Sequence, residues 1–319
     1  MKSATLVSAV TILAATANGS PVDSAPQPRS TNTGTTLPGL PKGCMTSKNG
    51  IAWGWLPDDG SNGAVNMKVL NSDTGKKACF FGDYSHISST SYDGSDITGK
   101  AGSVEGAIMV PSIMPTGVKW NQIDSTLAGK IGNAVRAFTQ KGITTYLRFA
   151  HEMNCYGKPK CASPAYPGYQ DYAGFKQAWI NVAKECRAID GCYMVWSPNL
   201  QDLDSLNNWF PGNDYIDVIA VDHYPRSDSD VANGFAGNFG TFYDQFVKPN
   251  NKPFMIGETA YGGSLAQKDA WVKALTTGDF SKYPLYHGAM WFEYNKEANF
   301  YVVYDQSQDQ IKTFDGNFA

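Results

Sequence analysis

The residues with the clearest chemical potential stand at the end of an apolar, β-rich run. Residues 144–156 begin as a strand-like segment and end in a cluster of polar side chains. This cluster consists of Arg148, His151, Glu152 and Asn154. A second short apolar run, residues 252–259, also ends in a glutamate, Glu258. Two carboxyl groups facing one cleft suit the hydrolysis of a glycosidic bond, because one protonates the leaving oxygen and the other attacks carbon or activates water.

The two glutamates are too far apart in the chain to be neighbours by local structure, so only the fold can bring them together. Each one alone fits a solvated strand end as well as a catalytic group. Their matching contexts favour a shared site. The neighbouring Arg148 and His151 have the charges needed to move the pKa values of the two carboxyl groups apart.

Apolar runs alternate with amphipathic segments along the chain, which predicts parallel βα units. Strands are expected at residues 51–55, 79–84, 107–113, 144–149, 193–196, 216–221, 254–256 and 288–291. Helices are expected at residues 64–70, 123–138, 172–186, 239–247 and 266–275, and a terminal hairpin or edge segment at 300–319. Eight such units predict the α/β class and a (β/α)8 TIM barrel, whose active-site face lies at the carboxyl ends of the strands.

The Arg-x-x-His-Glu-Met-Asn pattern at residues 148–154 resembles glycoside hydrolase family 26, the retaining β-mannanase and β-glucanase group of the (β/α)8 glycosidase clan. Further segments resemble the ends of that family's fifth, sixth and seventh strands. They are Trp196-Ser197-Pro198-Asn199, Asp222-His223-Tyr224 and Gly257-Glu258. The resemblance implies a double displacement in which Glu152 is the acid/base and Glu258 the nucleophile.

The resemblance, together with the positions of polar and aromatic residues near strand ends, predicts a set of substrate-binding residues. They are His151, Arg148, Tyr224, Trp291, Asn154 and Trp196. Within this set, Tyr224 is expected to hydrogen-bond the nucleophile, Arg148 to point inward at a carboxylate, and Trp291 to stack on a sugar ring. Asn199 is a further candidate for a hydroxyl partner. Carboxyl groups ranked below the two glutamates are Asp83, Glu105, Asp222 and Glu293. No cofactor and no metal are expected.

The substrate is less defined than the catalytic pair. The family's Trp-His pair at the end of strand three is absent from residues 110–115, and a loop between two cysteines replaces an aromatic-rich segment after residue 154. Family membership favours β-1,4-mannan. A β-1,3- or mixed-linkage glucan or a β-1,3-xylan would use the same machinery. An alternative from another class is a catalytically inactive barrel that binds polysaccharide.

Composition limits the partners. The 319 residues are 42% hydrophobic and suit a single barrel of about 250 residues with loops. A net charge of −3 without a long basic run argues against nucleic acid as a partner. No segment after the N-terminus is apolar enough to predict a membrane span. We expect a monomer that binds a polysaccharide or an oligosaccharide.

The N-terminus has the pattern of a secretory signal. Lys2 precedes a short apolar stretch at residues 4–15, and Ala15-Thr16-Ala17 fits a cleavage site. We therefore expect a signal peptide at residues 1–17 and a secreted, extracellular protein. Residues 18–43, rich in Ser, Thr and Pro, form a linker or propeptide, and the catalytic domain spans residues 44–319.

Six cysteines agree with export, because an even number behind a signal peptide predicts disulfides rather than free thiols. Local spacing favours the pairs Cys155–Cys161 and Cys186–Cys192, which leaves Cys44 for Cys79. A zinc site is the rival interpretation, but no Cys-x-x-Cys and no cluster of histidines is present.

Overall fold

Eight parallel strands close into a barrel in which each strand pairs with the next along the chain and β8 pairs with β1. In the computed structural model, residues 34–158, 165–201 and 203–319 are described. The strands are β1 Ala52–Pro57, β2 Phe80–His86, β3 Ile108–Met114, β4 Thr145–Phe149, β5 Cys192–Trp196, β6 Val218–Asp222, β7 Phe254–Thr259 and β8 Tyr286–Glu293. This confirms the predicted TIM barrel, and each expected strand overlaps an observed one.

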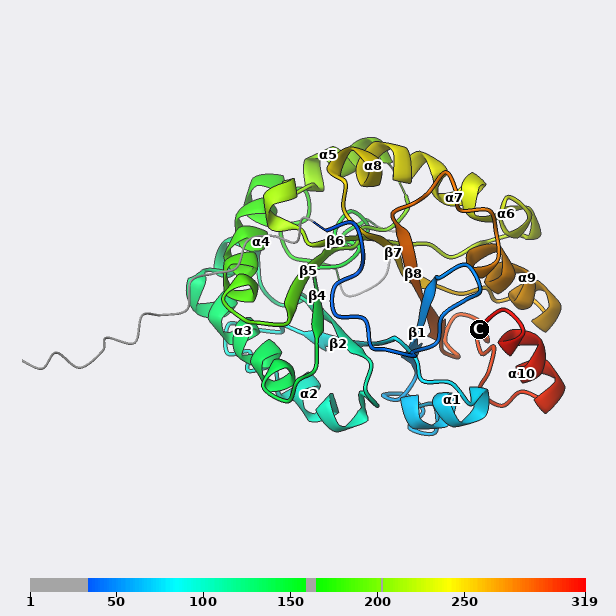
Figure 1. Ribbon diagram of the computed structural model, residues 1–319. Coiled ribbons are helices and arrows are strands. Elements are labelled where there is room, and N and C mark those ends of the chain that lie inside the picture. Colours follow the sequence, from blue (N-terminus) through cyan, green and yellow to red (C-terminus); the bar gives the residue numbers. More distant parts are fainter. Residues whose placement is uncertain (1–33, 159–164, 202) are drawn as a thin grey trace, which may run out of the picture.

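Helices surround the barrel as an outer ring (Figure 1). They are α1 Met67–Thr74, α2 Ser95–Thr98, α3 Ser125–Thr139, α4 Tyr172–Arg187, α5 Leu206–Trp209, α6 Asp228–Ala232, α7 Gly234–Phe242, α8 Lys248–Asn250, α9 Leu265–Thr276 and α10 Gln308–Asp315. Short 3₁₀ turns lie at Gly99–Ser103, Trp120–Gln122, Leu203–Ser205 and Asn213–Tyr215, and a π-helical turn continues α7 at Tyr243–Val247.

Side-chain caps explain where the long helices begin. Asp124 accepts a hydrogen bond from the backbone N–H of Leu127 at the start of α3, and Asp171 caps α4 through Gly174. Such caps satisfy backbone donors that have no partner within the helix. The apolar faces of α3 and α4 then pack on the barrel and on each other.

The expected terminal hairpin at 300–319 is wrong, because α10 occupies residues 308–315. Ser307 caps this helix by accepting from the N–H of Gln310, and Phe314 packs against Trp53 and Trp55 of β1. The strand-like residues Val302 and Val303 precede the helix and are buried, which is why the sequence resembled an edge segment.

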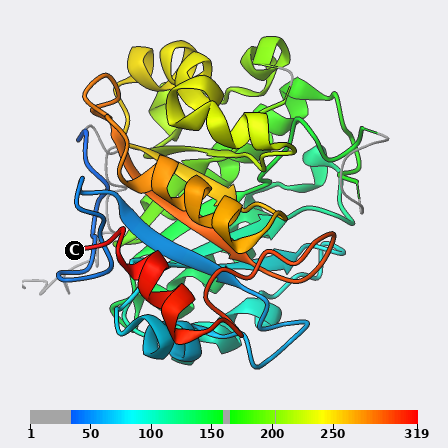
Figure 2. The same cartoon turned by 90° about the vertical axis from the view of Figure 1, so that its right-hand side faces the viewer.

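The amino ends of the strands form a closed end of the barrel, covered by residues 34–47. Leu37 is buried there, His287 donates to the carbonyl of Thr35, and Tyr146 donates to that of Pro38. The packed part of the chain therefore starts before the expected boundary at Cys44. The C-terminus lies at the same end, since the N–H of Ala319 donates to the carbonyl of Thr46 (Figure 2).

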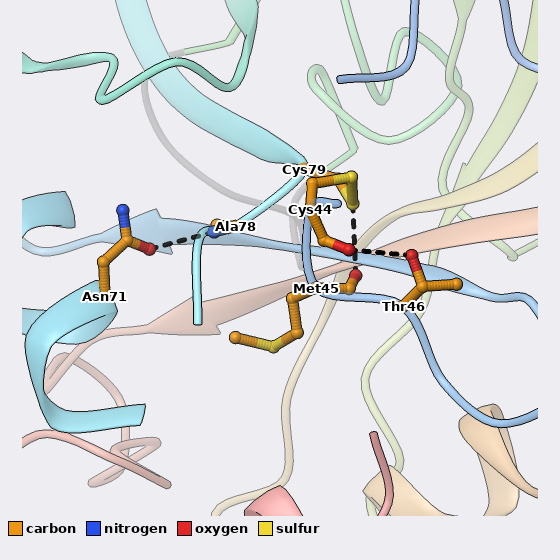
Figure 3. The surroundings of a disulfide bond; sticks show 6 residues. All are labelled: Cys44, Met45, Thr46, Asn71, Ala78 and Cys79. Carbon is orange, nitrogen blue, oxygen red and sulfur yellow. Dashed lines mark hydrogen bonds between the residues drawn. A yellow bond between two sulfur atoms is a disulfide. The ribbon is translucent and has the colours of Figure 1, made fainter. Parts of the chain in front are cut away.

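Two of the predicted disulfides are present among the described residues. Cys44–Cys79 ties the segment at the closed end to the start of β2, with Cα atoms 5.0 Å apart (Figure 3). Cys186–Cys192 links the end of α4 to β5. Cys155 is also disulfide-bonded, while Cys161, its predicted partner, lies outside the described residues, as do the expected signal peptide and most of the linker. None of the described helices has the length and apolar character that crossing a membrane requires.

Candidate active site

The carboxyl ends of β4 and β7 bring the two predicted glutamates to one end of the barrel. Glu258 lies within β7, and Glu152 follows β4 in a tight turn. Ala150 and Glu152 both have left-handed backbone conformations, with φ of 49° and 51°. A non-glycine residue with such a φ costs about 1–3 kcal/mol and is common at functional sites. The N–H of Glu152 donates to the carbonyl of Ser197, which fastens the turn to the end of β5.

Glu258 is held by charged and hydroxyl donors on both carboxylate oxygens. Arg148 donates to Oε1 at 2.8 Å, and the hydroxyl of Tyr224 donates to Oε2 at 2.9 Å. Burial alone would raise the pKa of Glu258, but the charge and the hydrogen bond of Arg148, together with a hydrogen bond from Tyr84, lower it below its usual value. Glu258 is therefore ionised at neutral pH.

Arg148 is the centre of this network and is completely buried. Besides Glu258, its guanidinium donates to Asp222 at 2.6 Å and to the hydroxyls of Ser112 at 2.8 Å and Ser197 at 3.2 Å. The expectation that Arg148 points inward at a carboxylate is met. The expectation that Arg148 binds the substrate directly is wrong, because no part of its side chain reaches the surface.

A glycine makes this arrangement possible. A Cβ atom on Gly257 would collide with Oδ1 of Asp222 and with the hydroxyl of Ser197. These two side chains also bond each other, at 2.8 Å. The strand that carries Glu258 can therefore approach β6 only with glycine at this position.

Among the described residues, Glu152 has fewer hydrogen-bond partners than Glu258. One oxygen accepts a hydrogen bond of 2.6 Å from the amide of Asn199. Burial and the negative charge of Glu258 raise the pKa of Glu152 to about 7, although Asn199 and Arg148 oppose the shift. The carboxyl group that needs a proton to act as an acid therefore has an environment that retains one near neutral pH.

His151 directly precedes Glu152 in the sequence and lies beside Glu258 in space. Its Nε2 is 3.6 Å from Oε1 of Glu258, and its ring packs against Tyr84 and Tyr156. Burial and the positive charge of Arg148 lower the pKa of His151 to about 3, so the imidazole is neutral at pH 7. Its Nδ1 has no hydrogen-bond partner among the described residues.

Two tryptophans expected at the cleft lie outside it. Trp291 is fully buried on the outer side of β8, where it stacks on Trp53 and donates to the carbonyl of Phe300. Trp196 packs between Phe242 and Phe246 under the helix layer. Neither offers a ring face to a sugar. The alternation of side chains along a strand explains the error for Trp291, because Phe292 is the residue that contacts Tyr224 beside the nucleophile.

Asn154 is also not placed to bind a substrate. Its amide donates to the carbonyls of Asn199 and Gln201, and its oxygen accepts from the N–H of Asn199. All of these bonds are internal, and the side chain is fully buried. Asn154 instead fixes the loop after β5, and with it the side chain of Asn199 that contacts Glu152.

Several residues of the site were not selected from the sequence. Tyr84, Ser112 and Ser197 were not singled out, and Asp222 was ranked low although it bonds Arg148. For two of them a signal existed, since Ser197 and Asp222 occur in the segments that resemble family strand ends. Asp83 lies in the middle of β2, with Lys100 at 3.4 Å, whereas Glu105 lies in an exposed turn. Among the described residues no group of three His, Cys, Asp or Glu side chains is arranged to hold a metal.

A pocket opens beside the carboxyl groups at the ends of β5 and β6. It is lined by Asn199, Leu200, Gln201, His223, Tyr224, Arg226 and Asp230. Asn199 contacts Glu152 and Tyr224 contacts Glu258, so the wall of the pocket includes a partner of each glutamate. The pocket therefore borders the site of the two glutamates.

The barrel glycoside hydrolases are a class of (β/α)8 proteins with two catalytic carboxyl groups at the ends of their strands. This protein has such a pair at the ends of its fourth and seventh strands, with the pKa of one glutamate raised and that of the other lowered. A model of this class, glycosyl hydrolase family 26, matches residues 106–301. Because the match covers more than half of the chain, this protein belongs to glycosyl hydrolase family 26 and is a glycoside hydrolase.

Solved structures share the fold at low sequence identity. A family 26 β-mannanase from Bacteroides ovatus is 15% identical, with a TM-score of 0.58 over 84% of this chain and 88% of that one. The catalytic domain of an endo-β-1,4-mannanase from Bacillus sp. JAMB-750 is 14% identical, with a TM-score of 0.59 over 85% and 86%. A modular endo-β-1,4-mannanase from Cellulomonas fimi is 15% identical, with a TM-score of 0.58 over 85% of this chain and 71% of that one. No curated protein matches the chain.

Proposed function

We propose that this protein is a secreted, retaining endo-β-glycanase that cleaves β-1,4-mannan by double displacement. The observation that carries the proposal is the contrast within the pair of glutamates. Glu258 is kept ionised by Arg148, whereas Glu152 has a pKa raised to about 7. One anion and one proton donor at the same cleft are what the first step of a retaining mechanism needs.

In the first step, Glu258 attacks the anomeric carbon and forms a glycosyl ester, while Glu152 gives its proton to the departing glycosidic oxygen. In the second step, Glu152 as carboxylate removes a proton from water, and the oxygen of that water displaces Glu258 from the sugar. Glu152 ends protonated and Glu258 ionised, as at the start. Tyr224 and Arg148 orient Glu258 through hydrogen bonds throughout.

Mannan is proposed as the substrate because the mannanases from B. ovatus, Bacillus sp. and C. fimi share this fold. The pocket between the ends of β5 and β6 supports a substrate site here, because Asn199 and Tyr224, which contact the two glutamates, both line it. A catalytically inactive barrel that only binds polysaccharide is disfavoured. Burying one arginine with several carboxyl groups costs desolvation free energy, and polysaccharide binding alone does not require such a network.

Secretion is proposed from the signal-like residues 1–17 and from the disulfides, which persist in oxidising compartments.

The test is hydrolysis of a polysaccharide panel by wild type and Glu258→Ala. The panel contains β-1,4-mannan, mixed-linkage glucan, β-1,3-glucan and β-1,3-xylan, and new reducing ends are counted. We expect wild type to release reducing ends from mannan and the variant to be slower by at least about 10⁴-fold. ¹H NMR of the first product should show the β anomer before mutarotation.

Cleavage of another polymer alone would replace mannan and leave the glutamate roles intact. Equal rates for wild type and variant would refute the role of Glu258, and an α anomer as first product would refute retention.

A further inference from the structure

Glu293, the last residue of β8, is a fully buried carboxyl group that the proposed reaction does not use. Glu293 is therefore not a surface group. No part of this side chain faces solvent, and its hydrogen-bond partners among the described residues all belong to the segment that follows β8.

The carboxylate gathers three consecutive backbone donors. Oε1 accepts from the N–H groups of Val303 at 2.8 Å and Tyr304 at 2.7 Å. The N–H of Val302 lies 3.1 Å from Oε1 and 3.0 Å from Oε2. A carboxylate is suited to several donors at once, because both of its oxygens only accept. Burial raises the pKa of Glu293, and these three N–H groups and the charge of Lys268 oppose that shift.

The contacts of Glu293 close a loop whose two ends meet at β8. We call residues 294–301 the β8 loop. The N–H of Phe300 donates to the carbonyl of Tyr294, Trp291 donates to the carbonyl of Phe300, and Lys268 donates to that of Tyr301. In Figure 2 the segment after β8 extends from the barrel at the end opposite to the C-terminus. That end is the one that carries Glu152 and Glu258.

Aromatic rings of β8 and of the β8 loop lie beside Tyr224, the hydroxyl partner of the nucleophile. Phe292 and Tyr294 stack with ring centroids 3.9 Å apart, and Phe300 is 5.9 Å from Phe292. Phe292 and Phe300 both contact Tyr224, at 5.8 and 6.0 Å. We call Phe292, Tyr294 and Phe300 the aromatic wall. Tyr224 in turn donates to Glu258, so the wall stands directly behind a partner of the nucleophile.

We propose that Glu293 is a positioning residue whose carboxylate fixes the β8 loop and thereby holds the aromatic wall in place for substrate binding. Glu293 does not touch the substrate. It acts by binding the backbone of residues 302–304, where the β8 loop returns to the barrel. The effect on substrate binding rests on the proposed glycosidase activity, whereas the effect on the β8 loop does not.

The replacement Glu293→Gln tests this role at nearly constant size. An amide keeps one acceptor oxygen but points N–H donors at backbone N–H donors, so part of the set of bonds is lost. Glu297→Gln is the matched control, because Glu297 belongs to the same loop and is exposed, with only the neighbouring Lys296 as ion-pair partner among the described residues.

Two readouts are measured on both variants and on wild type. Hydrogen exchange of peptides covering residues 294–304 should be at least about 10-fold faster in Glu293→Gln, and unchanged in Glu297→Gln. The KM for the polysaccharide that wild type cleaves should rise about 5- to 10-fold in Glu293→Gln with kcat within about 3-fold, as for a loss of binding common to ground and transition state.

Wild-type exchange in 294–304 together with wild-type KM would overturn the proposal, and so would a general loss of stability with KM unchanged. If Glu293→Gln does not fold, Glu293→Asp decides by the same criteria, because it keeps the charge but shortens the reach. If wild type cleaves no polysaccharide, the proposed function fails, while the exchange data still decide whether Glu293 fixes the β8 loop.

Discussion

Glu152 and Glu258 are the same side chain at the same end of one barrel, yet their surroundings differ. Glu258 has a guanidinium and a hydroxyl on its oxygens, and the pKa of its carboxyl is lowered. Glu152 has one amide partner, and burial beside Glu258 raises its pKa to about 7. Both are almost completely buried, so burial does not distinguish them. The placement of Arg148 does, because its hydrogen bonds reach Glu258 and not Glu152.

The comparison teaches that the two roles follow from one buried cation. Arg148 also binds Asp222, whose own pKa is raised by burial although Arg148 opposes the shift. Several buried carboxyl groups thus compete for a single positive charge. Glu258, with Arg148 on one oxygen and Tyr224 on the other, stays ionised, and Glu152, which accepts no hydrogen bond from Arg148, retains its proton. Each prediction below removes one part of this asymmetry.

Glu152→Ala should give the largest effect on the acid side of the pair. Hydrolysis of polysaccharide should fall about 10³-fold, because the leaving sugar is no longer protonated. An aryl glycoside with a good leaving group should still form the glycosyl ester, since its departure needs no proton. Added azide should then accelerate turnover and yield a β-glycosyl azide, measured by NMR. An α-azide, or no azide product, would contradict the assignment of Glu152.

Arg148→Met should reduce the pKa difference between the two glutamates by acting on Glu258. Without the guanidinium, the pKa of Glu258 rises and the acidic limb of the kcat/KM profile moves to higher pH. The loss at the pH optimum should be about 10²-fold, and stability should fall by about 3–5 kcal/mol because Asp222 and Glu258 remain buried without their cation. The measurements are pH–rate profiles and urea unfolding. An unchanged acidic limb in a folded variant would refute the role of Arg148.

Glu152→Gln should make the protein more stable in mild alkali. The folded-state pKa of Glu152, about 7, lies above the ordinary 4.5, so ionising this group costs native stability as the pH rises from about 4.5 through 7. A neutral amide avoids that cost. The variant should exceed wild type by about 3 kcal/mol at pH 8 and equal it near pH 4, by thermal unfolding. A difference independent of pH would contradict the raised pKa.

Asn199→Ala should give the smallest effect and act on Glu152 alone. The amide of Asn199 donates to Glu152 and so favours the charged form. Its removal should raise the pKa of Glu152 and move the alkaline limb of kcat/KM to higher pH, with about a 3- to 10-fold loss at the optimum. The acidic limb, set by Glu258, should not move. A shift of both limbs would mean that the two carboxyl groups cannot be perturbed separately.

The sequence predicted the barrel because each strand is an apolar run of the expected length, and it predicted the glutamates because both follow such runs. It also predicted the contact between Tyr224 and Glu258 through the family resemblance. It failed where a one-residue step decides which face a side chain takes, as with Trp291 and Phe292. It also failed where a polar residue bonds only across the fold, as with Asn154, Ser112 and Asp222, since such partners are not local in sequence.

The closed end of the barrel has a consequence for how the molecule can be attached to something else. Residues 34–47, the Cys44–Cys79 bridge and the C-terminal residue Ala319 all lie at the amino ends of the strands, bound to one another and to the barrel. Glu152 and Glu258 lie at the opposite end. A partner domain or a solid support joined before residue 34 or after residue 319 would therefore leave the cleft facing outward. Attachment at either point would leave Glu152 and Glu258 accessible to a polysaccharide.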